Sequence, residues 1–179
     1  MENSINILSE GVINQIAAGE VIQRPASIVK ELIENSIDAK AKKIEIIIKD
    51  AGKTLIQIID DGIGMNNKDA IICFQKHTTS KIKNIDDVMS IYTMGFRGEA
   101  LASISSIAEV ELKTKHITEN IGTLINIDNS NIKKNQQIAI SKGTSISVKN
   151  LFFNVPARKK FLKSDKIEMK HIIEVFIQL

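Results

Sequence analysis

The chain has few of the residues that cross-link small secreted proteins or hold metal-bound ones together. It contains one cysteine, Cys73, which cannot form an internal disulfide. Its three histidines, His77, His116 and His171, are scattered and lack the spacing of metal ligands. We therefore expect neither a disulfide framework nor a structural zinc site.

We also expect neither a membrane-spanning segment nor a signal peptide. No apolar run approaches the roughly 18 residues that a membrane span requires. Met1–Leu8 carries Glu2 and polar side chains where a signal peptide has a basic segment followed by an apolar one. With 179 residues, 43% of them hydrophobic and 25% charged, the chain has the size and composition of one globular domain. We expect a cytoplasmic protein with no membrane association.

Positive charge is in slight excess and is unevenly spread. Lys and Arg number 24 against 21 Asp and Glu, a net charge of +3 that is too small to indicate nucleic-acid binding by itself. Residues 151–170 hold six basic residues and only two acidic ones, Asp165 and Glu168. This basic run either contacts DNA phosphates, through Arg158, Lys159 and Lys160, or forms a solvated helix face.

Two helices are expected near the start of the chain, over residues 12–23 and from Pro25 onward. The second is the clearer one, because its apolar and polar side chains separate at helical spacing. Its apolar face consists of Ile28, Val29, Leu32, Ile33 and Ile37, and its polar face of Lys30, Glu31, Glu34, Asn35 and Asp38. We expect the first face to pack against the core.

Alternating and β-branched runs then predict a sheet. Residues 44–49 and 54–60 form an expected antiparallel hairpin, and its second strand, apolar on both faces and ending on Asp60, is expected to be internal. Further along we expect a short helix near 67–75, a long polar stretch over 76–98, a helix at 99–106, and strands at 108–115, 121–127 and 144–149. This order favours an α+β two-layer sandwich with a mostly antiparallel, mixed sheet over a doubly wound fold.

The last segment, residues 165–179, is apolar nearly all round. A helix of that kind is normally buried. We therefore expect it to be covered by a following domain of a longer protein.

Glu31 and Asn35 are the first candidates for chemistry. Side chains four residues apart on a helix lie about 5–6 Å apart at Cβ and can address one ligand together. An amide oxygen can bind Mg²⁺, and a carboxylate beside it can orient and deprotonate a water. Asp38 extends the row by one turn. The same pattern also fits an ordinary solvated helix face.

Two glycine-containing segments add further candidates. Asp60, at a strand end, can accept a hydrogen bond from an exocyclic amine, and Gly62 and Gly64 allow the backbone to approach a planar ring, although an ordinary turn also fits. The segment 95–101 places two glycines before a helix, where free N–H groups suit an anion. Neither the P-loop nor the dinucleotide fingerprint occurs in the chain. Thr78, Thr79, Ser80 and Lys81 add hydroxyls and a cation that can close over phosphates.

Together these stretches resemble the ATPase domain of the MutL family of DNA mismatch-repair proteins, within the GHKL group of ATPases. The resemblance runs from about Ile7 to Phe176. The pair Glu31 and Asn35 and the stretch 60–64 are typical of the whole group. Three longer matches are typical of MutL itself: Gln15–Pro25, Gly95–Leu101 continued by Ala102-Ser103-Ile104, and Asn154–Leu162.

The resemblance implies a role for each matching position. Glu31 matches the general base that activates the attacking water, Asn35 the Mg²⁺ ligand, and Asp60 the carboxylate that binds the adenine amine. The remaining implied contacts to ATP are made by Asp38, Gly64, Lys81, Gly95, Phe96, Arg97, Gly98, Leu101 and Thr144, of which Gly64 and Thr144 lie near the base and Lys81 near the phosphates. Position 61 is Asp where the motif often has Asn, a departure expected to matter little.

The implied function is that of a Mg²⁺-dependent ATPase acting as a dimerisation switch. Residues 1–179 would form the N-terminal ATP-binding domain, with a transducer domain and a C-terminal dimerisation domain following it. ATP would bring two such domains together as a homodimer and coordinate the mismatch-recognition protein MutS, a downstream nuclease and a helicase on DNA. Because the lysine that reaches the γ-phosphate is implied to come from the next domain, we expect this chain alone to hydrolyse ATP very slowly or not at all.

Two other classes of function share some of these features. A histidine kinase domain would share the Glu31–Asn35 pair and the 60–64 motif, but not the stretch 154–162. A nucleotide-independent interaction module would explain the basic run and would leave Glu31 and Asp60 without a role.

Overall fold

The computed structural model describes residues 6–78 and 98–179. The helices and strands in this part of the chain are α1 (Glu10–Val21), α2 (Pro25–Asp38), β1 (Ile44–Lys49), the 3-10 helix η1 (Asp50–Gly52), β2 (Leu55–Asp60), α3 (Asn67–Ile72), α5 (Ala100–Ile107), β3 (Glu109–Lys115), β4 (Gly122–Asp128), β5 (Asn131–Ile138), β6 (Gly143–Lys149), α6 (Pro156–Phe161) and α7 (Asp165–Gln178). None of these helices is both long and apolar enough to cross a membrane.

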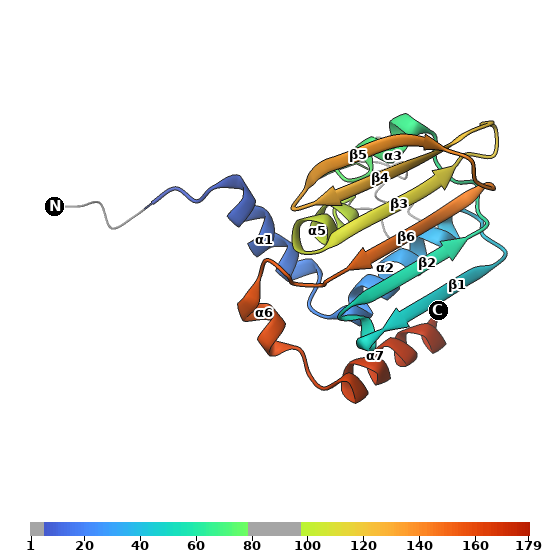
Figure 1. Cartoon of the computed structure of the whole chain (residues 1–179). Helices are drawn as coiled ribbons and strands as arrows, with labels where there is room; N and C mark the ends of the chain where they lie inside the picture. Colours follow the sequence, from blue (N-terminus) through green and yellow to red (C-terminus); the bar gives the residue numbers. More distant parts are fainter. Residues whose placement is uncertain (1–5, 79–97) are drawn as a thin grey trace, which may run out of the picture.

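The strands form one six-stranded sheet in the order β1-β2-β6-β3-β4-β5 (Figure 1). Each of its strand pairings is antiparallel. The predicted α+β class is confirmed, and β2 is internal as expected, because it lies between β1 and β6. Its last residue, Asp60, is therefore flanked on both sides by ordered strands.

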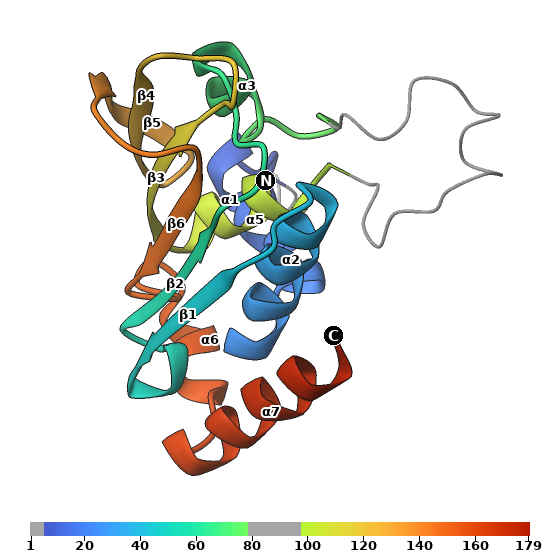
Figure 2. The same cartoon turned by 90° about the vertical axis from the view of Figure 1, so that its right-hand side faces the viewer.

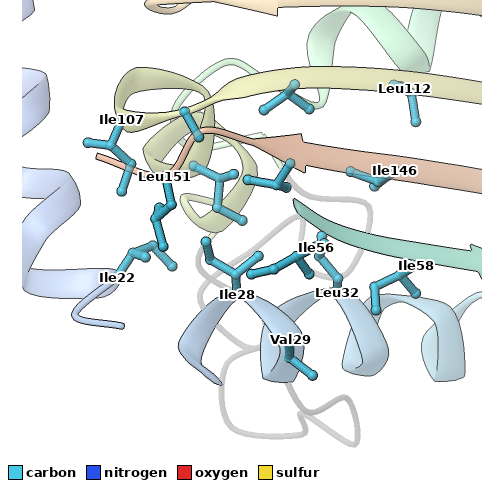
Figure 3. Close-up of a cluster of buried hydrophobic side chains, with 14 of the residues drawn as sticks. Ile22, Ile28, Val29, Leu32, Ile56, Ile58, Ile107, Leu112, Ile146 and Leu151 are labelled. Atoms are coloured by element: carbon cyan, nitrogen blue, oxygen red, sulfur yellow. The ribbon is translucent and has the colours of Figure 1, made fainter. Parts of the chain in front are cut away.

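The helices α1, α2 and α5 cover one face of the sheet, which gives the predicted two layers (Figure 2). The core lies between α2 and the central strands. Ile28 and Leu32 of α2 point toward Ile56 and Ile58 of β2 (Figure 3), and all four side chains are buried. Burying an aliphatic side chain of this size contributes about 1.5–3 kcal/mol relative to leaving it exposed. This packing fixes α2 beside the end of β2.

The two faces of α2 differ in part from the prediction. Ile37, predicted to pack, is 39% exposed because it lies at the edge of the apolar arc in the last turn. Glu34, predicted on the polar face, is 6% exposed and pairs with Lys30 over 3.6 Å. The side of α2 that carries Lys30 is not solvated throughout, because α7 packs against α2 (Figure 2).

The last helix is only partly buried within the described chain, and its expected cover by a following domain stays a prediction. In α7 only Glu168 and Ile172 are buried, whereas Phe176 and Ile177 are 58% and 76% exposed. The physical reason is that α7 contacts α2 and η1 along one side, which leaves its other apolar side chains uncovered.

The strand β5, the short helix α6 and the 3-10 helix η1 were not predicted. The strand β5 is polar and almost entirely exposed, because it is an edge strand with little apolar pattern. It follows a two-residue turn at Asn129 and Ser130, both with positive φ, which is the conformation of a tight hairpin. The short helix α6 begins at Pro156, a residue favoured in the first turn.

Candidate functional site

The candidate site lies where β2 ends, and strand register builds its floor. Asp60 stands opposite Thr144 at the start of β6, and Thr144 stands opposite Thr114 on β3. The three polar residues thus form one row across three neighbouring strands. Because side chains alternate along a strand, and Leu112 and Ile146 belong to the core, this row faces the helical layer.

Asp60 is held on that face by two hydrogen bonds. The hydroxyl of Ser36, on α2, donates to Asp60 Oδ2 at 3.0 Å, and the backbone N–H of Gly62 donates to Oδ1 at 2.9 Å. Burial raises the pKa of the Asp60 carboxyl, while the hydrogen bonds from Gly62, Ser36 and the backbone of Thr144 oppose that rise. The result is a half-buried carboxyl group with a fixed orientation, suited to accept a hydrogen bond from a ligand.

Asp61 makes different contacts from its neighbour. Its Oδ1 accepts hydrogen bonds from the backbone N–H groups of Lys42 and Lys43, at 2.7 and 2.9 Å. These backbone hydrogen bonds, first from Lys43 and then from Lys42, lower the pKa of Asp61. Asp61 therefore ties the end of β2 to the chain that enters β1.

The glycines after Asp60 are needed by the protein's own packing. Gly64 has φ +67°, and a Cβ there would lie 2.0 Å from the carbonyl oxygen of Lys115. A Cβ on Gly62 would lie 2.7 Å from the carbonyl oxygen of Ala39. Ile63, between these glycines, makes two backbone hydrogen bonds: its N–H donates to Ala39 O, and its carbonyl oxygen accepts from Ile117 N–H. In this structure the two glycines thus allow close contact with the neighbouring backbone at Ala39 and Lys115. Their predicted close contact with a planar ring stays a prediction.

Replacing Gly64 by alanine is expected to destabilise the domain by about 3 kcal/mol, since it adds a left-handed Cβ and a clash with rigid backbone. This corresponds to a melting temperature roughly 6–12 °C lower. Gly11→Ala is the matched control, because a Cβ at Gly11, inside helix α1, meets nothing within 4 Å. Thermal unfolding followed by circular dichroism should show Gly11→Ala unchanged or slightly more stable. An unchanged Gly64→Ala would contradict the packing described above.

The predicted metal and water residues lie on α2. Glu31, Asn35 and Asp38 are all half-buried on this helix. Ser36, which bonds to Asp60, directly follows Asn35. The helix therefore places Asn35 one residue from the serine that contacts the carboxyl group at the end of β2, with Glu31 one turn earlier.

The predicted phosphate-binding residues are only partly described. Gly98, with φ +64°, and Leu101, which packs against the core, lie at the start of α5. A Cβ on Gly98 would lie 2.4 Å from the carbonyl oxygen of Thr78, so residues 78 and 98 are in backbone contact. The predicted contacts of Lys81, Gly95, Phe96 and Arg97 lie outside the described residues, as do Thr79 and Ser80.

One residue of the basic run, Arg158, holds two helices together. Arg158 Nη1 donates to the carbonyl oxygen of Gly19 at 2.8 Å, which joins α6 to α1. Lys159 and Lys160 are exposed. Two of the three MutL-typical stretches, 15–25 and 154–162, therefore contact each other, and Arg158 is engaged with protein backbone.

The sequence reasoning missed two residues of this site, Ser36 and Thr114. Ser36 lies on the apolar face of α2, and Thr114 lies on the apolar face of β3. Both carry a hydroxyl group and both are buried. That position was the available signal, because a buried hydroxyl needs a hydrogen-bond partner. Their partners could not be read without strand register and helix packing.

Comparison with known proteins identifies the family. Residues 23–160 match the family model described as "Histidine kinase-, DNA gyrase B-, and HSP90-like ATPase". The chain belongs to this ATPase family. The match covers α2 and the strands that hold Asp60, Thr114 and Thr144, which is the part of the fold that forms the site.

Within this family, the predicted resemblance to MutL is confirmed. The chain is 59% identical over 176 residues to the DNA mismatch repair protein MutL of Christiangramia forsetii, and 55% identical over 176 residues to that of Flavobacterium johnsoniae. Each match covers 98% of this chain, but 28% and 27% of the two relatives. The chain thus spans less than a third of the length of the MutL relatives that it matches.

Solved structures give the same result. The Aquifex aeolicus MutL ATPase domain complexed with ADP aligns with a TM-score of 0.68 and 34% identity, covering 87% of this chain and 54% of that one. The N-terminal domain of a DNA repair protein aligns with a TM-score of 0.76 and 34% identity, covering 92% of this chain and 47% of that one. The fold of a MutL ATPase domain is therefore the fold of this chain.

Proposed function

We propose that the chain binds ATP together with Mg²⁺ and takes part in hydrolysing it as the N-terminal domain of a mismatch-repair protein. The observation that carries this proposal is the Asp60 carboxyl, fixed at the end of β2 by Ser36 and Gly62. Asp60 accepts a hydrogen bond from the adenine amine, with Gly64 and Thr144 beside the base. The Aquifex aeolicus MutL domain complexed with ADP supports nucleotide binding by this fold.

The hydrolytic residues are proposed on α2. Glu31 takes a proton from the water that attacks the γ-phosphorus, and the products are ADP and phosphate. Asn35 contributes an amide oxygen to Mg²⁺, which prefers oxygen ligands and, when bound, offsets the negative charge of the phosphates. Asp38 lies one turn beyond Asn35. Lys81, the stretch 95–98 and Leu101 are proposed to contact the phosphates.

The wider role of the protein is also a proposal, since the chain spans less than a third of its MutL relatives. ATP would drive homodimerisation of this domain and coordinate MutS, a nuclease and a helicase in the cytoplasm. A following domain would cover the apolar side chains of α7 and supply the lysine for the γ-phosphate. For that reason we expect the chain alone to have very little ATPase activity.

Within the basic run, we assign contact with DNA to Lys159 and Lys160. Both are exposed at the end of α6, and α6 carries its basic residues in its last turn. Arg158 is used in binding the Gly19 carbonyl. Contacts from exposed lysines to phosphates are electrostatic and independent of base sequence.

A thermal shift experiment tests nucleotide binding. With a non-hydrolysable ATP analogue and Mg²⁺ at 100 times the dissociation constant, the domain should gain about 2.7 kcal/mol, or roughly 5–10 °C in melting temperature. The same analogue with EDTA should give a smaller shift, because EDTA removes the Mg²⁺ that is proposed to join the phosphates to Asn35. The control is Mg²⁺ alone. No shift with any nucleotide would favour the nucleotide-independent interaction module instead.

A further inference from the structure

Thr114 lies beside the candidate adenine site but has no role in the function proposed so far. It is fully buried on β3, with 0% of its surface exposed. Its hydroxyl oxygen lies 2.9 Å from Met65 N, 3.1 Å from Gly143 O and 3.0 Å from Thr144 Oγ1. A single side chain therefore contacts the loop after Asp60 and the first residues of β6.

The chemistry of these contacts makes the hydroxyl a connecting group. The N–H of Met65 donates to Thr114 Oγ1, whereas the Gly143 carbonyl only accepts. Thr114 has one hydroxyl proton, so it donates either to Gly143 O or to Thr144 Oγ1, and in the first case the Thr144 hydroxyl donates to Thr114. In both arrangements the loop after Asp60 and the start of β6 are joined through one buried oxygen.

Both joined segments also contact Asp60. The loop contributes the Gly62 N–H to the carboxyl group, and the Thr144 backbone lies close enough to affect its pKa. The packing around them is tight: a Cβ on Gly143 would lie 2.1 Å from Asp60 O, and one on Gly64 would lie 3.0 Å from Gly143 O. Tight packing transmits a displacement of one segment to the next.

We propose that Thr114 is a positioning residue for the purine end of the nucleotide site. Its hydroxyl sets the distance between Gly64, Thr144 and Asp60, so that the adenine amine meets the Asp60 carboxyl and the base fits between the loop and β6. Thr114 itself does not contact the nucleotide. This inference rests on the proposed binding of ATP and adds a determinant of its selectivity for adenine over guanine.

The experiment compares ATP and GTP binding, with Mg²⁺, by the whole 179-residue chain and by Thr114→Val and Thr114→Ser variants. Valine keeps the shape but removes the hydroxyl, and should weaken ATP binding about tenfold, as expected for one lost buried hydrogen bond. GTP carries a carbonyl at position 6, where adenine carries the amine that is proposed to donate to Asp60. Its binding should therefore be affected much less, and the ATP-to-GTP preference should fall by nearly the same factor. Serine retains the hydroxyl and should restore the preference.

Thr123→Val is the matched control. Thr123 stands directly opposite Thr114 on β4 and is also buried, and its hydroxyl accepts a hydrogen bond from Asn67 rather than from a residue of the site. Its ATP-to-GTP preference should equal that of the unmodified chain. If Thr114→Val does not fold, Thr114→Cys, a residue of similar size with a weak hydrogen-bonding group, carries the same comparison.

The outcomes separate this inference from the function on which it rests. If the unmodified chain binds neither ATP nor GTP, the proposed function and the inference are both overturned. If it prefers ATP and Thr114→Val keeps that preference, only the inference is overturned. If the affinities for ATP and GTP fall equally in both the valine and the serine variants, Thr114 has only a structural role, and the inference is overturned as well. Loss of preference in Thr114→Val alone, restored by serine, supports it.

Discussion

Asp60→Asn is expected to weaken ATP binding by about 10- to 100-fold while raising the melting temperature of the nucleotide-free domain at neutral pH. The affinity falls because a hydrogen bond to a charged group, worth about 1.5–3 kcal/mol, is lost at the adenine amine. Isothermal titration with a non-hydrolysable ATP analogue measures this change. Unaltered affinity would remove the main support for the proposed site.

The gain in stability follows from the surroundings of Asp60. Burial raises the pKa of its carboxyl in the folded state above the usual value of 3.8. Its contribution to stability is therefore fully present below about that value and is lost as the pH rises through the folded pKa. Asparagine is neutral at every pH. It can accept from Gly62 N–H and donate to Ser36, whose own proton is then free to bond Leu32 O at 3.0 Å.

Asp61→Asn is the matched control, because the neighbouring carboxyl has the opposite shift. Backbone hydrogen bonds lower the pKa of Asp61, so its contribution is present above the usual value and is lost as the pH falls through the folded pKa. At pH 7 Asp60→Asn should therefore melt above the unmodified chain and Asp61→Asn below it, and both differences should shrink as the pH is lowered toward 3.8. The same sign for both variants would contradict these assignments.

Glu31→Gln is expected to slow ATP hydrolysis by about 10²- to 10⁴-fold, the usual contribution of a general base, with little change in Mg²⁺-ATP binding. Glutamine keeps the shape of the side chain but cannot take the proton from water. Phosphate release should be measured in a version that includes the region following this domain in its relatives, since the chain alone is expected to be nearly inactive. Binding is measured on the same protein.

Glu34→Gln serves as the control for this variant. Glu34 lies one turn from Lys30 on the same helix and pairs with it, so its substitution tests α2 without touching the proposed base. Hydrolysis should be largely retained. Equal losses in the Glu31 and Glu34 variants would show that α2 had been disturbed as a whole and would contradict the role of Glu31.

The parts of the fold that the sequence predicts well are those in which burial is set locally. The apolar stripe of α2, the hairpin of β1 and β2, and the alternation of Val110, Leu112 and Thr114 all have the expected secondary structure. The edge strand β5 was missed because an exposed edge carries no apolar pattern to detect. The apolar sequence of α7 predicts that the helix is covered, but its periodicity does not specify by what, and in the described chain α2 and η1 contact only one side of it.

The candidate site divides in the same way. Asp60, Glu31 and Asn35 could be chosen from residue type and spacing, and from the resemblance to MutL. The parts played by Ser36 and Thr114 could not, because each acts across strands or helices far apart in the chain. Ser36 is 24 residues from Asp60, and Thr114 is 49 residues from Met65. Hydrogen bonds of this kind follow from tertiary packing rather than from local pattern.

The contact between Arg158 and Gly19 has a consequence for how the beginning of the chain is directed. A Cβ at Gly19 would lie 1.8 Å from Arg158 Cζ, so any side chain there would push the guanidinium off the carbonyl that it grips. Helix α1 extends outward from that point and carries the exposed apolar side chains of Val12, Ile13 and Ile16 (Figure 1). The placement of this exposed apolar surface thus depends in part on a residue 139 positions away in the chain, in addition to the packing of α1 against α5.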